Sequence, residues 1–559
     1  MKRNKITALI CIFALLCIMI AGCVSDNDND IPVADNQGGG NANAGTSTTT
    51  PAPANEPEEP EEGAIGTFPI PGDHSLVYWV GLNSNVSANF TGLNETPFGQ
   101  ALIEQTGVNV EFLHPPAGQE TEQFNLIIAS MDFPDIMEIN WLNDYHGGPE
   151  RAISDGVIHR LNDIIDRYAP NTKNFLENLR PDLGRLVITD ESSYFVFPFL
   201  RESEPLRVFT GSFMRADWLN DLNMDPPETL DEWEDILTAF RDEKGAIAPF
   251  AYQWWQRGNC PVASAYGIRI GFFINDAGNV SYGYVEDAYL DYVTRMNRWF
   301  RDGLLDPDFG TTPGDVWIAR ITGGDTGAAL GNIGAGIGVL MNAMADDPVF
   351  DLVPVQTPVL QRGQQPRLGH MDAAFSGGHS AAITTGAQNV EVAARFLDFG
   401  FSEQGYRLYN FGVEGVSYNM VDGFHQYTDL IMENPNGWPI GQAIASVARA
   451  SYGGPFVQSE DYVWQFFRLQ RQRDALDLWS RADSERFVLP PITLLPDEAS
   501  RIAMVLGELG TYVEEMHLRF VFGEEPLDNF DNFRDTIYRF GLQEVLDIYT
   551  EALARFYNR

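Results

Sequence analysis

The fold is decided by the stretch from Ser75 to Pro116, which contains SLVYWVGL (75–82), PFGQALIEQTG (97–107) and VNVEFLHPP (108–116). The first and third segments are short apolar runs of the kind that form buried strands, and the second has helical spacing and stops at Gly107. A strand, a helix and a second strand in this order are typical of α/β proteins. The sequence therefore predicts an α/β body that begins near Phe68.

The same alternation continues along the chain. QFNLIIAS (123–130) predicts a helix, PDIMEIN (134–140) a strand, and NDIIDRYA (162–169) a short helix that stops before Pro170. From Pro496 to Arg559 the pattern is almost entirely helical, with apolar residues three or four positions apart. We therefore expect mixed α/β structure followed by a helical C-terminal tail.

The N-terminus has the pattern of a lipoprotein export signal. A cationic start precedes an apolar run from Ile6 to Ile20, and IAGC follows at residues 20–23. The run is shorter than the ~20 residues of a spanning helix, so we expect a signal peptide at 1–22 that is cleaved before a lipidated Cys23. The alternative is an uncleaved anchor helix with an incidental cysteine. Either interpretation places the body outside the cytoplasmic membrane.

The segment 23–66 differs in composition from the rest of the chain. After Cys23 it consists mainly of Asp, Asn, Gly, Thr, Pro and Glu, including TSTTTPAPANEPEEPEEG (46–63). Such a segment buries too little apolar surface to offset the entropy of ordering it. We expect a disordered tether that holds the body away from the lipid surface.

Composition and charge exclude several classes of function. The 559 residues are 44% apolar and 12% aromatic, enough for a large core in more than one domain. Cleavage of the signal removes three cations and no acid, so the formal net charge becomes -42 - 3 = -45. This charge argues against nucleic acid and, less firmly, against polyuronates. After cleavage and lipidation Cys260 has no partner for a disulfide.

Several collinear segments resemble the extracellular solute-binding proteins of sugar-importing ABC transporters, family 1 type, in particular the large Gram-positive lipoprotein members. The segments are TPFGQALIEQTGVNVEF (96–112), IIASMDFPDIMEINW (127–141), ISDGVIHRLNDIIDRYAPN (153–171), SFMRADWLNDLNMDPPETLDEW (212–233), MNRWFRDGLLDPDF (296–309), AARFLDFGFSEQGYRLYNFGVEGVSY (393–418) and IYTEALARFY (548–557). The resemblance covers about Ser75 to Arg559, and the set is far more specific than any single segment.

This resemblance implies a two-lobed periplasmic-binding-protein-like α/β fold of type II, in which each lobe is a mixed sheet flanked by helices, with a helical C-terminal tail. The expected boundaries place the first lobe at 67–205 and the second at 206–369. The chain would return to the first lobe at 370–440, and the helical segment 441–559 would complete the second lobe.

A sugar site needs a few aromatic platforms with polar groups at their edges. Asn140, Trp141 and Asp144 follow the strand 134–140, where the carboxyl end of a parallel strand should open into a crevice. The resemblance also makes this segment part of the cleft. We therefore expect these three residues to bind ligand, with Trp141 in the core as the alternative.

The second aromatic cluster is PFAYQWWQRG (249–258), which supplies Tyr252, Trp254 and Trp255. Adjacent residues of one strand face opposite sides, so one tryptophan can lie in the core while the other is a platform. The pattern does not say which. Members of the maltose-binding type place an aromatic-rich loop here, and the resemblance therefore makes all three residues ligand-binding candidates.

Three further candidates come from later segments. Asn332 lies in GGDTGAALGNIGAGIGVLM (323–341), which has no GK[ST] and no GxGxxG and so does not predict a nucleotide site. By the resemblance this run is a strand that enters the cleft, and a plain tight turn is the alternative. Phe375 lies in LGHMDAAFSGGHSAAI (368–383), and Tyr418 is a turn aromatic that can face the cleft or only close a loop.

Neither a metal nor a cofactor is expected. His370, Asp372 and His379 do not have the spacing of a zinc set. Some family members carry a calcium loop, but ITDESSYFVFP (188–198) lacks the spacing and the turn glycine of such a loop.

The sequence thus predicts a non-catalytic, lipid-anchored receptor on the outer face of the cytoplasmic membrane. It would bind an oligosaccharide as a monomer and deliver it to ABC permease subunits. The charge favours a neutral sugar, although Arg201 or Arg257 could hold an acidic one. The alternatives are an exported glycoside hydrolase or polysaccharide lyase, and a binding protein for a peptide or another small solute.

Overall fold

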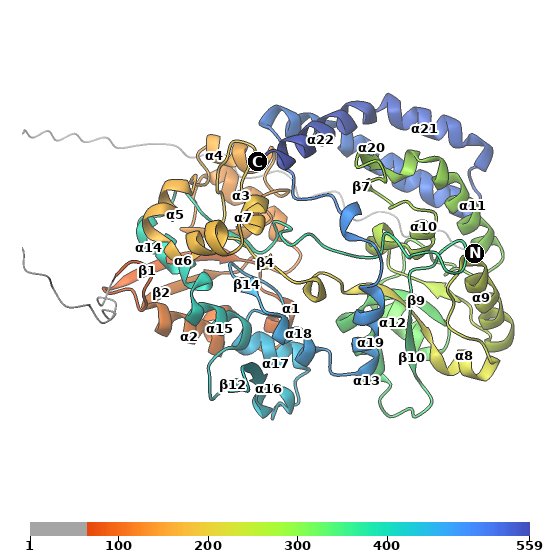
Figure 1. Cartoon of the computed structure of the whole chain (residues 1–559), viewed down its shortest axis with the longest axis horizontal. Coiled ribbons are helices and arrows are strands. Elements are labelled where there is room, and N and C mark those ends of the chain that lie inside the picture. Colours follow the sequence, from red (N-terminus) through yellow and green to blue (C-terminus); the bar gives the residue numbers. More distant parts are fainter. Residues whose placement is uncertain (1–63) are drawn as a thin grey trace, which may run out of the picture. The chain divides into compact units, whose positions relative to one another are not determined.

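The computed structural model describes residues 64–559 (Figure 1). The expected signal peptide, Cys23 and nearly all of the expected tether lie outside the described residues. The chain from Pro60 to Arg559 forms one compact unit. None of the helices between residues 64 and 559 combines the length and the apolar character that a bilayer crossing requires.

The first sheet has the strand order β11-β3-β1-β2. Its strands are β1 (His74–Val80), β2 (Val108–Leu113), β3 (Ile136–Ile139) and β11 (Ser380–Ile383). β1 pairs in parallel with both β2 and β3, and β11 runs antiparallel to β3. The helix α2 (Pro97–Thr106) connects β1 to β2 and ends at Gly107, whose positive φ of 71° suits glycine. The predicted strand-helix-strand start is confirmed.

Both faces of the first sheet are covered. Tyr78 belongs to one apolar cluster and its neighbour Trp79 to another, because successive strand residues point to opposite faces. Helices α14 (Val390–Asp398) and α5 (Asn162–Tyr168) pack against each other on the Tyr78 face. We call the part of the body built on this sheet the first lobe.

The second sheet has the order β10-β5-β9-β6 and defines the second lobe. Its strands are β5 (Thr210–Arg215), β6 (Phe250–Ala251), β9 (Ala328–Asn332) and β10 (Leu352–Val355). β5 is antiparallel to β9 and β10, while β6 is parallel to β9. Met214 and Phe213 lie in different apolar clusters, so this sheet is also covered on both faces. Each lobe is therefore a mixed sheet between helical layers.

The chain crosses between the two sheets three times. The crossings follow β4 (Leu200–Arg201), β10 and β14 (Val457–Gln458), and β4 and β14 pair in parallel with each other. Before the last crossing, α17 (Ile440–Val447) packs on α1 (Ser84–Ser87) and α2 of the first lobe. The expected residue numbers of the lobe boundaries stay a prediction.

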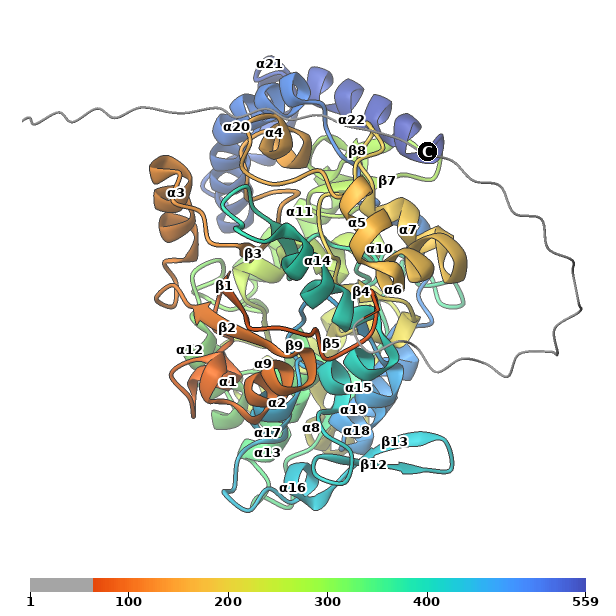
Figure 2. The ribbon, with the colours of Figure 1, turned by 90° about the vertical axis from the view of Figure 1, so that its left-hand side faces the viewer.

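Three C-terminal helices lie together along one edge of the described body in both views (Figures 1 and 2). They are α20 (Pro496–Phe522), α21 (Phe530–Arg539) and α22 (Leu542–Tyr557). α20 packs on α11 (Asp287–Arg301) of the second lobe and also contacts α4 (Gly148–Ser154) of the first lobe. The predicted helical tail is confirmed, and it bridges the two lobes.

The remaining elements complete the covering layers and the connections. The other α-helices are α3 (Glu120–Ser130), α6 (Pro170–Lys173), α7 (Pro181–Val187), α8 (Ala216–Leu222), α9 (Leu230–Lys244), α10 (Pro261–Ala265), α12 (Gly314–Gly323), α13 (Val339–Ala343), α15 (Glu403–Phe411), α16 (Asp429–Met432), α18 (Glu460–Phe466) and α19 (Gln470–Trp479). The 3-10 and π helices are η1 (Leu93–Glu95), η2 (Asn174–Leu179), η3 (Glu204–Leu206), η4 (Trp254–Asn259), η5 (Gly283–Val285), η6 (Ile333–Gly338), η7 (Phe399–Phe401), η8 (Glu485–Phe487) and η9 (Leu527–Asn529). Two small hairpins are formed by β7 (Phe272–Ile274) with β8 (Val280–Tyr282) and by β12 (Tyr418–Val421) with β13 (Phe424–Tyr427).

Candidate functional site

The candidate site surrounds the loop from Asn140 to Gly148, which leaves β3 and leads into α4. Because β1 and β3 are parallel, their carboxyl ends open at the same edge of the first sheet. Ligands of open α/β sheets bind in the crevice outside these strand ends. Three hollows flank this loop, and their lining residues come from both lobes.

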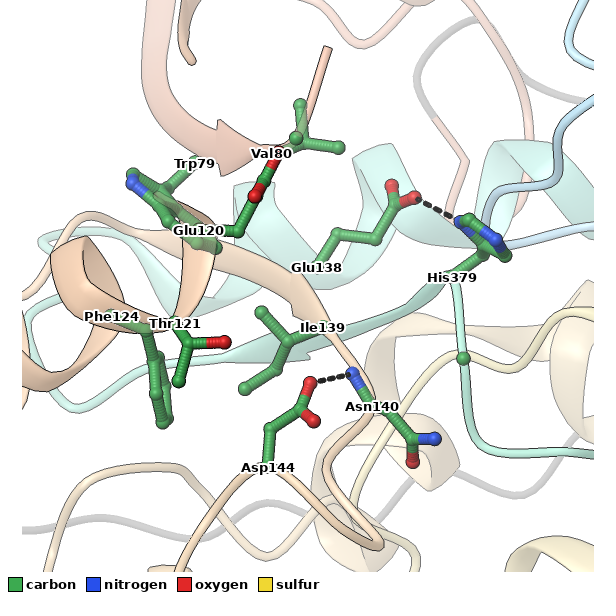
Figure 3. Close-up of a pocket in the computed structure, with 12 residues that line it drawn as sticks. Trp79, Val80, Glu120, Thr121, Phe124, Glu138, Ile139, Asn140, Asp144 and His379 are labelled. Atoms are coloured by element: carbon green, nitrogen blue, oxygen red, sulfur yellow. Dashed lines mark hydrogen bonds and ion pairs between the residues drawn. The ribbon is translucent and has the colours of Figure 1, made fainter. Parts of the chain in front are cut away.

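The first hollow has a volume of about 300 Å³ and lies at the ends of β1 and β3 (Figure 3). Its apolar side includes Trp79, Phe124 and Ile139, and its polar side carries Glu138 and Asp144. The full lining is Trp79, Val80, Gly81, Glu120, Thr121, Phe124, Glu138, Ile139, Asn140, Asp144, Gly378 and His379. Apolar surface with a few convergent polar groups is typical of small-molecule sites.

Glu138 sits at the base of the first hollow in a buried network. Arg449 donates from Nη1 to Oε2 at 2.9 Å and from Nη2 to Oε1 at 2.6 Å, and the Tyr78 hydroxyl donates to Oε2 at 2.7 Å. Burial, and then the charge of Glu138, raises the pKa of Tyr78, so that hydroxyl keeps its proton. His379 approaches with Nδ1 3.9 Å from Oε1. The carboxylate is therefore fixed in position by charged and neutral donors.

Asp144 and Asn140 form the rim of the same hollow. The Asn140 backbone N–H donates to Asp144 Oδ2 at 3.0 Å, which fixes the carboxylate beside the end of β3 (Figure 3). Partial burial raises the pKa of Asp144 from its ordinary value, against the effect of this hydrogen bond. The side-chain Oδ1 of Asn140 is buried and has no hydrogen-bond partner among residues 64–559. The rim thus offers the Asp144 carboxylate to a ligand, whereas the Asn140 Oδ1 is covered.

The second hollow is larger, about 560 Å³, and spans the two lobes. The first lobe contributes Tyr145 and Ser376, and the second contributes Arg269, Phe272 and part of α20. A third hollow of about 330 Å³ shares Asp144 with the first hollow and Tyr145 with the second. The three hollows follow one loop, which suits an elongated ligand better than a single small molecule.

The chain is similar to known proteins at low sequence identity. No family model matches the chain. Lipoprotein LipO of Bacillus subtilis is 22% identical over 366 residues, which are 61% of this chain and 67% of LipO. The fructooligosaccharide ABC transporter substrate-binding protein FusA of Streptococcus pneumoniae is 22% identical over 489 residues, 81% of this chain and 86% of FusA.

Solved structures extend the comparison to the whole body. The alginate-binding protein AlgQ2 without calcium ion matches with a TM-score of 0.71 and 23% identity, over 88% of this chain and 100% of that one. FusA in complex with kestose also has a TM-score of 0.71, with 18% identity over 87% of this chain and 99% of that one. This chain has the two-lobed fold of the ABC-transporter solute-binding proteins. The predicted fold class is confirmed.

Of the three candidates that follow β3, two line the first hollow and the third lies in the core. Asn140 and Asp144 line the first hollow, and their contact with ligand stays a prediction. Trp141 has no exposed surface, and its Nε1 donates to the Met137 carbonyl at 3.2 Å. The turn after β3 folds the indole back under the sheet beside Phe124. Trp141 is therefore a core residue in this structure and not a platform.

The two tryptophans of the segment 249–258 do not lie on one strand, contrary to the expectation from the sequence. β6 ends at Ala251, and a 3-10 helix begins at Trp254. Tyr252 is only 2% exposed and packs edge-on against Phe309 in the core of the second lobe. Tyr252 is therefore not a platform.

The two tryptophans differ in exposure. Trp254 is half-buried, with its ring against Phe309 and His517. Trp255 is 61% exposed, and its Nε1 donates to Gln253 Oε1 at 2.5 Å. Trp255 thus exposes an indole face to solvent, whereas the ring of Trp254 packs against the core of the second lobe. Neither lines the three hollows.

The last three candidates also take structural positions. Asn332 Oδ1 accepts from the Thr210 hydroxyl at 2.6 Å and so joins the end of β9 to the start of β5. Phe375 is one of the residues that line the second hollow, but its ring is fully buried beside Phe195. Tyr418 is 2% exposed and packs on Phe411, away from the loop 140–148. Asn332 and Tyr418 therefore do not line the three hollows, and Phe375 lines the second one with a ring that is buried in the core.

Sequence reasoning missed Glu138, His379 and Arg269. Glu138 interrupts the apolar strand PDIMEIN, and a carboxylate at such a position needs a buried partner. That signal was available in the sequence, but Arg449, its partner, lies 311 residues away. His379 and Arg269 carried no local signal of their position at the hollows. Among the described residues, no three His, Cys, Asp or Glu side chains gather as a metal ion would require.

Proposed function

We propose that this protein is a receptor that binds an oligosaccharide beside the loop Asn140–Gly148 and delivers it to ABC permease subunits. The observation that carries the proposal is the run of hollows that leads from the carboxyl ends of β1 and β3 to α20, across the two lobes. The fold adds support, because one structural neighbour is FusA in complex with kestose.

The chemistry of the hollows suits a sugar. A sugar has a flat face of C–H groups and a rim of hydroxyls, so it needs apolar surface with polar groups beside it. Phe124 and Ile139 supply apolar surface in the first hollow, and Asp144 supplies a hydrogen-bond acceptor at its rim. In the second hollow Phe272 and Tyr549 form an edge-to-face aromatic pair with ring centroids 4.8 Å apart.

We infer binding without catalysis. A glycosidase needs two carboxyl groups across the scissile bond, one to move a proton and one to attack or to activate water. Glu138 accepts three hydrogen bonds from Arg449 and Tyr78, so it has little freedom to do either. The bound sugar would instead link the lobes and shift an open population towards a closed one.

The proposed place of action is the outer face of the cytoplasmic membrane. A lipid on Cys23 would anchor the chain, the segment 23–66 would act as the tether, and the body would work as a monomer. The sequence pattern at residues 20–23 supports the anchor, and one relative carries the name lipoprotein LipO.

Native mass spectrometry of the protein with a mixture of oligosaccharides tests the proposal. We expect one intact sugar per chain, and we expect Asp144→Ala to weaken binding about ten-fold or more. Asp163→Ala removes the same charge from an exposed position on α5 and is the matched control. Sugar fragments in the mixture would favour a hydrolase or lyase, and no retained sugar would refute the receptor.

A further inference from the structure

The second hollow contains an arginine that has no ion pair with any residue in the described part of the chain. Arg269 is partly buried and lines the hollow, yet no carboxylate oxygen of residues 64–559 lies within the 4 Å of an ion pair. Other partly buried or buried arginines of the described residues do have such a partner. Arg201 pairs with Asp372, Arg257 with Glu514, and Arg215 with Asp217.

The hydrogen bonds of Arg269 are few and long. One Nη2 contact reaches Asn259 Oδ1 at 3.4 Å and another the Gly369 carbonyl at 3.3 Å, and the buried Nε has no partner among residues 64–559. Guanidinium groups have five donors, and their strongest bonds are bidentate pairs with carboxylates. Most of the N–H donors of Arg269 therefore form no hydrogen bond with residues 64–559.

The surroundings make an unpaired cation costly. Burial lowers the pKa of Arg269, and the charge of Asp372 acts in the opposite direction. Asp372 already has other partners and forms no ion pair with Arg269, because Arg201 Nη1 donates to it at 2.6 Å and His370 Nε2 lies 3.3 Å away. A desolvated charge without a close partner is a favourable place for an anionic ligand group.

The two ends of the site differ in charge. The charged side chains that line the second hollow are Arg269 and Asp372, and Arg201 offsets the charge of Asp372. Its other titratable side chains are Tyr145, His146 and Tyr549. The first hollow has Glu120, Asp144 and Glu138, with Arg449 offsetting Glu138. A carboxylate is therefore favoured at one end and repelled at the other.

We propose that the second hollow binds the carboxylate of a single acidic sugar unit through Arg269, while neutral units occupy the first hollow. This inference rests on the proposed function and names its substrate class, an oligosaccharide with one uronic acid. The net charge of -42 agrees with one acidic unit better than with a polyuronate.

Calorimetric titration with three trisaccharides of equal length tests this assignment. The probes are a neutral xylotriose, an aldotriouronic acid with one glucuronic acid unit, and trigalacturonate. We expect the mono-acidic probe to bind roughly ten-fold or more tighter than the neutral one. We expect trigalacturonate to bind more weakly than the mono-acidic probe.

Arg269→Gln should remove the preference for the mono-acidic probe. Arg269→Lys should keep part of it, because the positive charge remains but the two parallel N–H donors of the guanidinium are lost. Arg185→Gln is the matched control, since it removes one exposed arginine of α7 far in sequence from the hollows. Melting temperatures of all variants separate lost binding from lost folding, because Arg269 has no ion pair to lose among the residues that the structure describes.

The outcomes are distinct. A neutral probe that binds as tightly as the mono-acidic one, or a preference that survives in Arg269→Gln, would overturn this inference and leave the receptor proposal standing. If none of the three probes nor any other oligosaccharide binds, the receptor proposal fails and the inference fails with it.

Discussion

Replacing Glu138 with Gln should strongly destabilise the protein, because it leaves Arg449 charged and buried without a counter-ion. The side chains of Glu138 and Arg449 are 1% and 3% exposed, and two N–H donors of Arg449 contact the carboxylate. Breaking a buried pair from one side typically costs about 3–5 kcal/mol, and glutamine still accepts one of the hydrogen bonds. We therefore expect a loss of about 3 kcal/mol in the free energy of unfolding, measured by urea denaturation.

A matched exposed pair provides the control for this prediction. Glu403 and Arg407 are 80% and 40% exposed on one face of α15, so Glu403→Gln should cost less than about 1 kcal/mol. Changing both buried partners together, Glu138→Leu with Arg449→Met, should recover most of the loss, because no buried charge is then left unpaired. If Glu138→Gln costs no more than Glu403→Gln, the pair is not a buried ionic contact and the argument for a fixed carboxylate fails.

Three further predictions concern pH, packing and processing. Burial lowers the pKa of His517 from 6.5 to about 3, so the unfolded chain takes up a proton below pH 6.5 while the folded chain does not. The free energy of unfolding then falls by ~1.36 kcal/mol for each pH unit below 6.5, so between pH 7 and pH 5 wild type should lose ~2 kcal/mol more than His517→Gln. Equal pH profiles of the two proteins in chemical denaturation would refute the pKa shift. Trp141→Ala should reduce the free energy of unfolding by ~3–5 kcal/mol and Trp255→Ala by less than ~1 kcal/mol, because the first indole is fully buried and the second is 61% exposed; the reverse order in thermal melts would contradict their placement. Cys23→Ala should abolish fatty-acid labelling of the chain in cells, and persistent labelling would disprove the lipobox interpretation.

Much of the architecture could be predicted because it depends on local patterns. The apolar run at 75–82, the helix that stops at Gly107 and the strand after it are each specified by neighbouring residues, and they appear as β1, α2 and β2. The C-terminal helices follow from apolar spacing alone. The sheet order was not predictable in this way, because β11 joins β3 from more than 200 residues downstream.

The candidate site was harder to predict because it depends on where side chains point after folding. Asn140 and Asp144 follow a strand end and were found by that rule. Trp141 shares their position in the sequence, but the turn directs its ring into the core. Trp254 and Trp255 looked like neighbours on a strand, and the 3-10 helix that contains them gives them different exposures.

Contacts between side chains that are far apart in the sequence were the hardest to predict. Arg449 stabilises Glu138 from another part of the chain, and Arg269 is distinctive only because it has no ion pair between residues 64 and 559. Arg201 and Arg257, the arginines that the sequence suggested for an acidic sugar, are bound to Asp372 and Glu514. Such contacts become visible only when the side chains are placed in three dimensions.

A crystal structure of the protein with an oligosaccharide that binds it in calorimetry would show directly where the ligand sits. We expect an intact sugar beside the loop Asn140–Gly148, in contact with Asp144 of the first lobe and Arg269 of the second. A sugar cleaved in the crystal, or one seated away from this loop, for example in the hollow lined by Trp464 and Arg468, would contradict this expectation.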